Sequence, residues 1–310
     1  MIAFVFPGQG SQKVGMGVDL AAASSAARQV FEEVDEALSQ NLSSLMRDGP
    51  EDELTLTANA QPAIMANAIA VARVLEEGGI RLAEKGEAVA GHSLGEYSAL
   101  AAVGAFSLTD TARLLRIRGE AMQAAVPVGV GGMCALLGAD IEKATALAQA
   151  AAQGDVCEVA NDNDPGQVVL SGHLAAIDRA VELAKEYGCK RAVKLPVSAP
   201  FHCSLMGPAA DNMAEALAAT PPKAFLLPLY ANVTAAAVTD PAAEQELLVE
   251  QITGRVRWRE SVAAMTEAGV THFVELGGKV LSPMIRKIAP DSAQTSLVTM
   301  ADIEAFAKEI

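Results

Sequence analysis

The stretch Ala88-Val89-Ala90-Gly91-His92-Ser93-Leu94-Gly95 decides the fold, because it places a G-x-S-x-G motif between a predicted strand and a predicted helix. Residues Ala88–Gly91 are small and apolar, as in a buried strand, and the alanine-rich run Gly95–Val103 is typical of a helix. A serine at a sharp strand-to-helix turn has strained backbone angles, and side chains two positions to either side of it would collide. The stretch therefore predicts an α/β sheet that carries an exposed serine at a strand end.

Short β-rich runs alternate with long alanine-rich helical runs along the rest of the chain, which is the pattern of a parallel sheet with crossover helices. The predicted strands of this sheet are Ala3–Phe6, Ala88–Gly91, Leu226–Ala231 and Thr271–Glu275. The predicted helices include Pro62–Glu77, Gly95–Val103, Thr109–Ala125 and Ser204–Ala219.

A segment between the glycine-rich residues 127–132 and the boundary Pro196–Pro200 follows a different order. It predicts strands at Met133–Leu137, Val156–Asn161, Val168–Ser171 and Arg191–Leu195, with helices at Ile141–Ala152 and Leu174–Tyr187. The order β-α-β-β-α-β is that of ferredoxin-like domains. We expect a ferredoxin-like small domain at residues 128–196, inserted in a large, discontinuous α/β-hydrolase-like catalytic domain with a parallel sheet at residues 1–127 and 197–310.

Composition excludes several classes of function. The net charge of −15 argues against nucleic acid as a partner, because binding phosphates needs a basic face. No apolar run approaches the roughly 18 residues that span a bilayer, and Met1–Phe6 is interpreted as a buried strand instead of a signal peptide. The four cysteines show no zinc-binding or CxxC spacing, so we expect free thiols in a cytoplasmic, reducing compartment. A monomer is expected.

The nucleophile predicted by the motif is Ser93, and a serine needs a base. His92 adjoins Ser93 and is expected to support the turn, whereas His173 lies in a predicted turn of the small domain. His202 follows a proline-containing irregular stretch that can fix an imidazole, and His272 opens a predicted strand. Position alone leaves His202 and His272 as rival candidates for the base.

Five motifs occur along the chain in an order that resembles the malonyl-CoA:acyl carrier protein transacylases of bacterial fatty-acid synthesis. They are Phe6–Gln12, Gln61-Pro62, Gly91–Tyr97, Arg116–Gly119 and Pro200-Phe201-His202. The resemblance covers essentially the whole chain, including the predicted insertion.

The resemblance implies a ping-pong transfer in which Ser93 is acylated and His202 is the general base. It implies that the backbone N–H groups of Gln9 and Leu94 form the oxyanion hole, and that the carbonyl of Gln251 orients the histidine. Arg118 would bind the free malonyl carboxylate through paired hydrogen bonds. Gln61, Asn163 and Phe201 would line the substrate pocket, where a bulky Phe201 would favour malonyl over methylmalonyl.

The same resemblance implies malonyl-CoA and the phosphopantetheine thiol of acyl carrier protein as substrates, and no metal or other cofactor. Carrier proteins of this kind are acidic, as is this chain, so docking must use a local basic patch. Lys190 and Arg191 are the first candidates for that patch. Further candidates are Lys194, Arg255, Arg257, Arg259, Arg286 and Lys287.

Three other functions stay open at this point. A related malonyl or acyl transferase that serves malonate decarboxylation or polyketide loading would share the chemistry and differ in the carrier. A serine esterase or thioesterase would share the G-x-S-x-G motif, although such hydrolases place their histidine far towards the C-terminus, after an acid. A non-catalytic scaffold would carry an unreactive Ser93.

Overall fold

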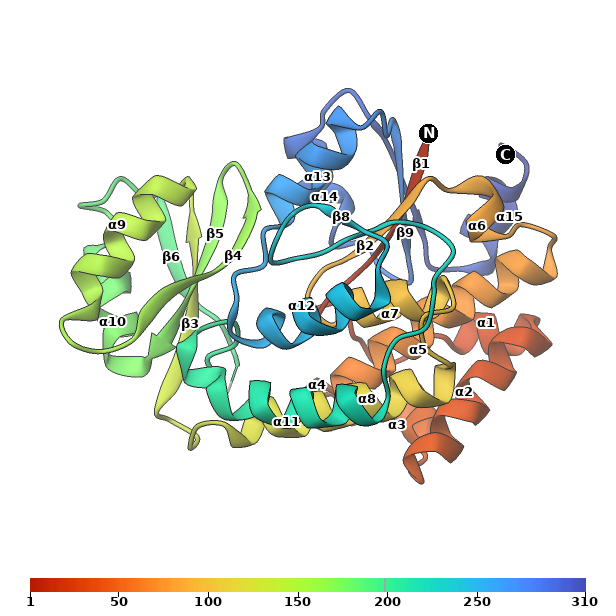
Figure 1. The fold of residues 1–310 in the computed structure, drawn as a ribbon, viewed down its shortest axis with the longest axis horizontal. Helices are drawn as coiled ribbons and strands as arrows, with labels where there is room; N and C mark the ends of the chain where they lie inside the picture. The colour runs from red at the N-terminus through yellow and green to blue at the C-terminus, as the bar shows by residue number, and fades with distance from the viewer. Residues whose placement is uncertain (198) are drawn as a thin grey trace.

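Two separate sheets organise the chain in the computed structural model, which describes residues 1–197 and 199–310. Figure 1 shows the smaller sheet with its two helices at one end of the long axis (green) and the N-terminal helices at the other end (red). Ser198, which falls within the predicted boundary Pro196–Pro200, lies outside the described residues.

The larger sheet contains six strands in the order β10-β9-β1-β2-β7-β8, and neighbouring strands run parallel except for the β7–β8 pair. These strands are β1 (Ile2–Phe6), β2 (Ala88–Gly91), β7 (Leu229–Tyr230), β8 (Ala237–Val238), β9 (His272–Leu276) and β10 (Ala293–Leu297). The predicted parallel sheet is confirmed, with β2 at an interior position between β1 and β7.

Alternating side chains of β1 enter two different cores, because successive residues of a strand point to opposite faces. Phe4 and Phe6 join the large core that includes helices α5 (Thr57–Glu77), α7 (Gly95–Ala102) and α8 (Leu108–Ala124). Ala3 and Val5 join a core with helices α13 (Trp258–Glu267) and α14 (Ser282–Ile288). All four side chains are fully buried. The sheet is therefore the middle layer of three, which is why its interior strands β1 and β2 are continuous apolar runs.

Helices surround the larger sheet on both faces. Their bounds are α1 (Val18–Ala23), α2 (Ser25–Leu38), α3 (Leu42–Asp48), α4 (Glu51–Thr55), α5 (Thr57–Glu77), α6 (Leu82–Lys85), α7 (Gly95–Ala102), α8 (Leu108–Ala124), α11 (Gly207–Ala219), α12 (Pro241–Thr253), α13 (Trp258–Glu267), α14 (Ser282–Ile288) and α15 (Met300–Ala307). A short 3₁₀ turn, η1 (Ser204–Met206), precedes α11. None of the helices in the described part of the chain is both long and apolar enough to cross a membrane.

The smaller sheet is antiparallel, with strand order β4-β5-β3-β6. Its elements are β3 (Gly131–Leu137), α9 (Ile141–Ala152), β4 (Cys157–Asp164), β5 (Gln167–His173), α10 (Leu174–Leu183) and β6 (Arg191–Lys194). The predicted β-α-β-β-α-β order is confirmed. The first and last strands are neighbours, and the N–H of Leu195 donates to the carbonyl of Met133 at 2.9 Å.

Side chains of β3 also divide between two cores. Cys134 and Leu136 pack with α9 and α10 in a core of their own, whereas Met133 and Ala135 join the large core. One face of the smaller sheet is thus covered by its own helices and the other lies against the rest of the protein. That the segment folds as a domain bounded by residues 128 and 196 stays a prediction.

Several element bounds differ from the predicted ones. Helix α5 begins at Thr57, five residues before Pro62, so this proline lies inside the helix and not at its first position. The strand predicted at Leu226–Ala231 contains only Leu229–Tyr230, because Pro228 has no N–H to donate to a neighbouring strand. Strand β10 was not predicted, because its sequence, Ala-Gln-Thr-Ser-Leu, does not alternate apolar and polar residues.

Candidate active site

Ser93 lies at the turn between β2 and α7, at the carboxyl edge of the parallel sheet, where α/β proteins gather their functional groups. Its φ of 55° is in the left-handed region, as the motif predicts. A Cβ on Gly91 would lie 1.9 Å from the Gly95 backbone, and a Cβ on Gly95 would lie 2.2 Å from the carbonyl oxygen of Phe6. Glycine is therefore required on both sides of Ser93.

His202 is the histidine that the fold brings to Ser93. Its Nε2 lies 2.8 Å from Ser93 Oγ, and its Nδ1 lies 2.8 Å from the carbonyl oxygen of Gln251. Since a carbonyl only accepts, Nδ1 must carry the proton and Nε2 is left free to accept the proton of Ser93. Burial and the positive charge of Arg118 lower the pKa of His202 to about 3, so the imidazole is neutral at pH 7.

Arg118, on α8, is 1 % exposed and its guanidinium lies beside the nucleophile. Nη2 donates to Ser93 Oγ at 3.2 Å and to Gln251 Oε1 at 2.9 Å, and Nη1 donates to Gln61 Oε1 at 2.8 Å. Among the described residues, Nε–H has no hydrogen-bond partner although it is buried. A guanidinium has five N–H groups, so donors remain for an incoming anion.

Gln9 and Leu94 bring backbone N–H groups to the same place. Both residues line the cavity around Ser93, and neither N–H donates a hydrogen bond to any residue that the structure describes. The loop that carries Gln9 approaches the serine turn closely, because Gly8 has no side chain: a Cβ there would lie 2.6 Å from the carbonyl oxygen of His92. Two free N–H groups beside a serine nucleophile can stabilise an oxyanion.

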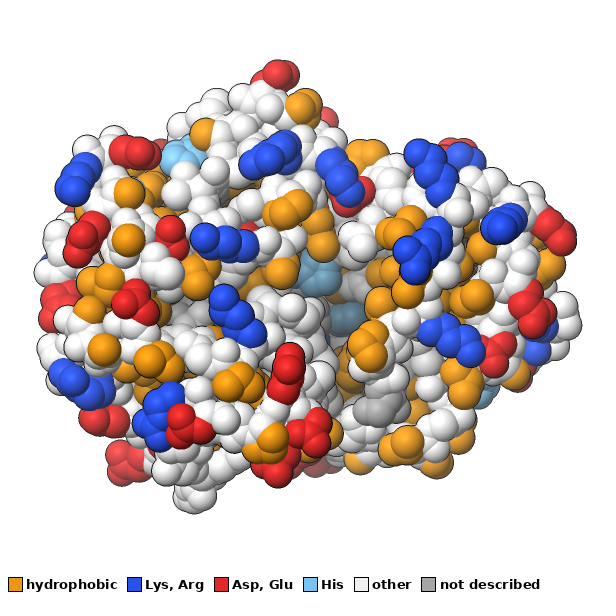
Figure 2. All heavy atoms as spheres, turned by 180° about the vertical axis from the view of Figure 1, so that it is seen from behind, with side chains coloured by type: hydrophobic (Ala, Val, Ile, Leu, Met, Phe, Trp, Pro, Cys, Tyr) orange, Lys and Arg blue, Asp and Glu red, His pale blue; other side chains and the backbone are white. Residues whose placement is uncertain are grey.

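A cavity of about 250 Å³ opens above Ser93. Figure 2 shows the corresponding face of the molecule, which has a hollow with histidine side chains at its bottom. Its lining includes Met133, Asn161 and Leu195 from the region of the smaller sheet, and Gln61 and Phe201 from the rest of the protein. The region of the smaller sheet and the rest of the protein therefore both line the site.

The remaining predicted residues lie further from Ser93. Asn163 is not among the residues that line the cavity; its Oδ1 lies 2.8 Å from Nε2 of His92, whose ring packs 5.7 Å from the ring of Trp258. His92 therefore has the supporting place that the sequence predicts. The exposed Lys190 and Arg191 lie at the start of β6, an edge strand of the smaller sheet.

The rival base does not reach the serine. His272 is the first residue of β9, which runs parallel to β1 and β2, so it lies at the opposite edge of the sheet from Ser93. Its Nε2 lies 2.8 Å from Thr295 Oγ1 instead. His173 Nδ1 accepts from the N–H of Val156 at 2.9 Å, within the smaller sheet.

Asn232 is a functional residue that sequence reasoning missed. Its Oδ1 accepts from the N–H of Ser93 at 2.8 Å, and its Nδ2 donates to the carbonyl of Gly91 at 2.6 Å, so its fully buried side chain clamps both sides of the serine. A usable signal was present, since Asn232 follows the predicted strand Leu226–Ala231 and must emerge at the same edge of the sheet as Ser93.

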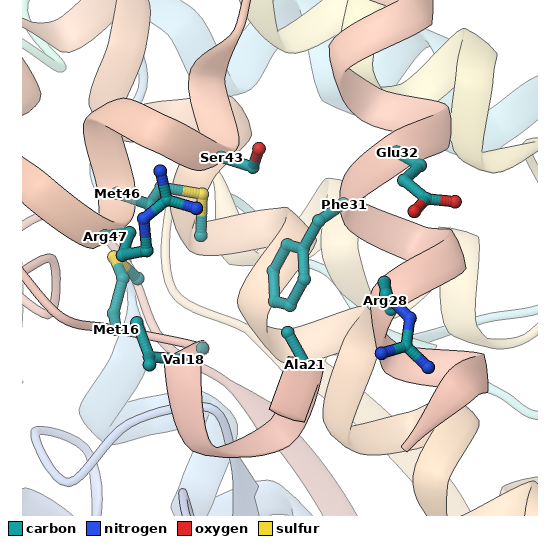
Figure 3. Close-up of a pocket in the computed structure, with 10 residues that line it drawn as sticks. Met16, Val18, Ala21, Arg28, Phe31, Glu32, Ser43, Met46 and Arg47 are labelled. Carbon is teal, nitrogen blue, oxygen red and sulfur yellow. The ribbon is translucent and has the colours of Figure 1, made fainter. Parts of the chain in front are cut away.

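A second cavity, of about 290 Å³, lies among α1, α2 and α3, and it shares no lining residue with the cavity around Ser93. Figure 3 shows Phe31 at its centre, with Arg47 on one side and Arg28 on the other. Its lining holds no histidine or cysteine, and the hydroxyl of its one serine, Ser43, donates a hydrogen bond to Asp35. Of these two cavities, the one around Ser93 holds the groups that can carry out nucleophilic chemistry.

Comparison with known proteins agrees with this geometry. Residues 3–287 match the family described as acyl transferase domain. The malonyl CoA-acyl carrier protein transacylase of Bacillus subtilis (strain 168) is 47 % identical over 289 residues, which cover 93 % of this chain and 90 % of the relative.

Solved structures give the same picture. An acyl-carrier-protein S-malonyltransferase from Bartonella henselae superposes with a TM-score of 0.97 at 52 % identity, covering 99 % of this chain and 98 % of that one. A malonyl-transacylase in complex with a type II PKS acyl-carrier protein superposes with a TM-score of 0.96 at 38 % identity, covering 100 % of this chain and 99 % of that one.

Proposed function

The chain belongs to the acyl transferase domain family and, within it, to the malonyl CoA-acyl carrier protein transacylases, and from this we propose how its own residues move the malonyl group. It transfers malonyl from malonyl-CoA to the phosphopantetheine thiol of acyl carrier protein. The single observation that carries the residue assignment is the 2.8 Å contact between Ser93 Oγ and His202 Nε2. The site is buried, and the guanidinium of Arg118 lies beside the serine.

In the first half-reaction, His202 Nε2 accepts the proton of Ser93 while Oγ attacks the thioester carbonyl of malonyl-CoA. The developing oxyanion receives hydrogen bonds from the N–H groups of Gln9 and Leu94, each worth about 3–4 kcal/mol in the transition state. The carbon–sulfur bond breaks, the histidine gives its proton to the CoA thiolate, and malonyl remains as an ester on Ser93.

In the second half-reaction, the thiol of the carrier protein gives its proton to His202 and attacks the ester. The Ser93 oxygen leaves and regains the proton. We propose that no metal or redox group takes part, because Ser93, His202 and the two N–H groups already supply the nucleophile, the base and the oxyanion donors.

Arg118 would hold the free carboxylate of the malonyl group with its unused N–H groups, Nε–H among them. The carboxylate would also offset the positive charge that helps to lower the pKa of His202. Binding of the correct substrate would therefore make the base stronger, which acetyl-CoA cannot do. Gln61 and Gln251 hold the guanidinium from two sides, and Phe201 forms a wall of the pocket.

We propose Lys190 and Arg191 as the docking patch for the acidic carrier protein. Both are exposed, and no ion pair engages either of them among the described residues. By contrast, Arg255 and Arg257 pair with Glu260, Arg259 pairs with Asp162, and Lys287 pairs with Asp164. Reversal of Lys190 and Arg191 to Glu should slow transfer to the carrier protein and leave acylation by malonyl-CoA unchanged.

We further infer a cytoplasmic location, supported by the four cysteines, which are all buried and free of disulfide bonds.

Intact-protein mass spectrometry after brief mixing with malonyl-CoA tests the proposal. A single malonyl adduct, absent from Ser93→Ala and weak with acetyl-CoA, is the expected result. Steady release of free malonate without an adduct would instead identify a hydrolase, and an adduct that persists in Ser93→Ala would remove the serine from the mechanism.

A further inference from the structure

Two glutamates are buried directly behind the nucleophile, and the transfer reaction makes no use of them. Glu96 lies in the first turn of α7 and Glu244 in the first turn of α12, and both are fully buried. Three of their four carboxyl oxygens, Glu96 Oε1 and both oxygens of Glu244, have no hydrogen-bond partner among the described residues. Buried polar atoms are rarely left unpaired, so this cluster needs an explanation.

The charges around the pair call for a proton. Burial raises the pKa of Glu96, and the charge of Arg118 opposes that shift. Burial raises the pKa of Glu244 too, and the negative charge of Glu96 raises it further. One carboxylate balances the buried guanidinium of Arg118, whereas a second would stand uncompensated in a low dielectric. Two carboxyl groups that share a site hold one proton for this reason.

The ionised member of the pair has a defined contact. Glu96 Oε2 accepts from the backbone N–H of Asn232 at 2.7 Å. The side chain of Asn232 in turn holds the N–H of Ser93 and the carbonyl of Gly91. This chain of hydrogen bonds runs from the glutamate pair to the strained turn that presents Ser93 to His202.

We propose that Glu96 and Glu244 share one proton, with Glu244 as the acid that donates to Glu96 Oε1 and Glu96 as the carboxylate that positions Asn232 behind Ser93. The shared proton satisfies the unpaired oxygen of Glu96 and one oxygen of Glu244. Both glutamates are positioning residues, because neither contacts the reacting atoms. The inference rests on the proposed role of Ser93 in so far as it predicts rates.

Infrared spectroscopy at neutral pH tests the proton itself. The wild-type protein should show the carbonyl stretch of one protonated carboxyl group, and Glu244→Gln should abolish it. Glu246→Gln, at an exposed position of the same helix, is the matched control and should leave the band in place. A spectrum without such a band, or one that Glu244→Gln leaves unchanged, would overturn the proposal whatever the fate of the Ser93 assignment.

Acylation kinetics test the positioning role. Glu244→Gln keeps an N–H donor for Glu96, so its rate of malonyl-enzyme formation should stay within about threefold of wild type. Glu244→Leu leaves Glu96 Oε1 without a donor and should slow this rate about tenfold or more, with the KM for malonyl-CoA little changed. Equal loss in both variants would contradict a proton donated by Glu244. Loss of the adduct in Ser93→Ala remains the separate test of the nucleophile.

Discussion

The guanidinium of Arg118 lies 3.2 Å from Ser93 Oγ, so the group proposed to recognise the substrate also donates to the nucleophile. This contact links recognition to reactivity. A cation at this distance favours the negative charge that Ser93 develops when it loses its proton, and it also disfavours the protonated form of His202. The two effects oppose each other until an anionic substrate arrives.

Arg118→Lys should separate these roles. Lysine keeps the charge and loses the paired hydrogen bonds, each worth about 1.5 kcal/mol or more, so kcat/KM for malonyl-CoA should fall by about 100-fold. The same constant for acetyl-CoA, which has no carboxylate to bind, should change by less than about threefold. Stopped-flow acylation with both thioesters measures this. Equal losses for the two substrates would assign Arg118 to Ser93 positioning alone.

Phe201→Ala should widen the range of acyl groups. Phe201 is 9 % exposed, precedes His202 and lines the cavity, so the wild-type protein should prefer malonyl-CoA to methylmalonyl-CoA. Removal of the ring should narrow this preference by about tenfold, since one methyl group in a tight pocket is worth about 1–3 kcal/mol. Competition between the two thioesters, read by mass spectrometry, gives the ratio. A wild-type protein that accepts both equally would show that Phe201 is no barrier.

The glycines around Ser93 should tolerate no side chain. Gly91→Ala and Gly95→Ala place a Cβ about 2 Å from backbone atoms that belong to different segments, and we expect both variants to fail to fold or to lose most of their stability. Gly207→Ala is the matched control, because a Cβ there meets no atom within 4 Å. It starts helix α11 and should be neutral or stabilising by about 0.5–1 kcal/mol. Thermal unfolding followed by circular dichroism distinguishes these outcomes.

His202 should make the protein sensitive to acid. Its pKa of about 3 in the folded protein lies below the ordinary value of 6.5, so the unfolded chain binds the proton first as the pH falls. The stability that the neutral imidazole contributes is complete above pH 6.5 and is lost as the pH falls from 6.5 towards 3, at up to about 1.4 kcal/mol per pH unit.

Urea unfolding of wild type and His202→Asn between pH 7.5 and 5.5 measures that contribution as a difference. Asparagine tolerates the φ of 56° at this position, so the backbone conformation is kept. Glu96 and Glu244, whose raised pKa values act with the opposite sign, are present in both proteins and cancel. The free energy of unfolding of wild type minus that of His202→Asn should become smaller as the pH falls. Parallel curves for the two proteins would mean that His202 titrates normally.

The sequence predicts those parts of the site that depend on residues close together along the chain. Ser93 follows from one motif and its flanking strand and helix, and the ferredoxin-like order follows from elements in sequence. Position along the chain did not separate His202 from His272, and the family resemblance favoured His202. The structure places His202 beside Ser93 and His272 at the opposite edge of the sheet. Arg118 and Gln251 came from family resemblance alone.

The residues that were missed depend on contacts between distant segments. Asn232 and Glu96 lie 136 positions apart and meet where the backbone N–H of Asn232 donates to the Glu96 carboxylate. A buried polar residue looks like any surface polar residue in a sequence, because burial is decided by what packs on it. Glu244 illustrates this, since neighbouring glutamates on α12 are exposed and nothing local distinguishes it.

The hydrogen bond between Leu195 and Met133 brings together the two ends of the segment that the sequence predicts as an insertion, so the chain enters and leaves that segment at almost one point. We expect that such a segment could be exchanged between relatives through two neighbouring junctions. The exchange would replace one wall of the cavity and its exposed basic residues, while the serine turn, the histidine and the arginine stay on the recipient scaffold. With the proposed roles of these residues, choice of carrier and bond-making chemistry would lie on separate segments of the chain, and chimeric enzymes could inherit the two traits from different parents.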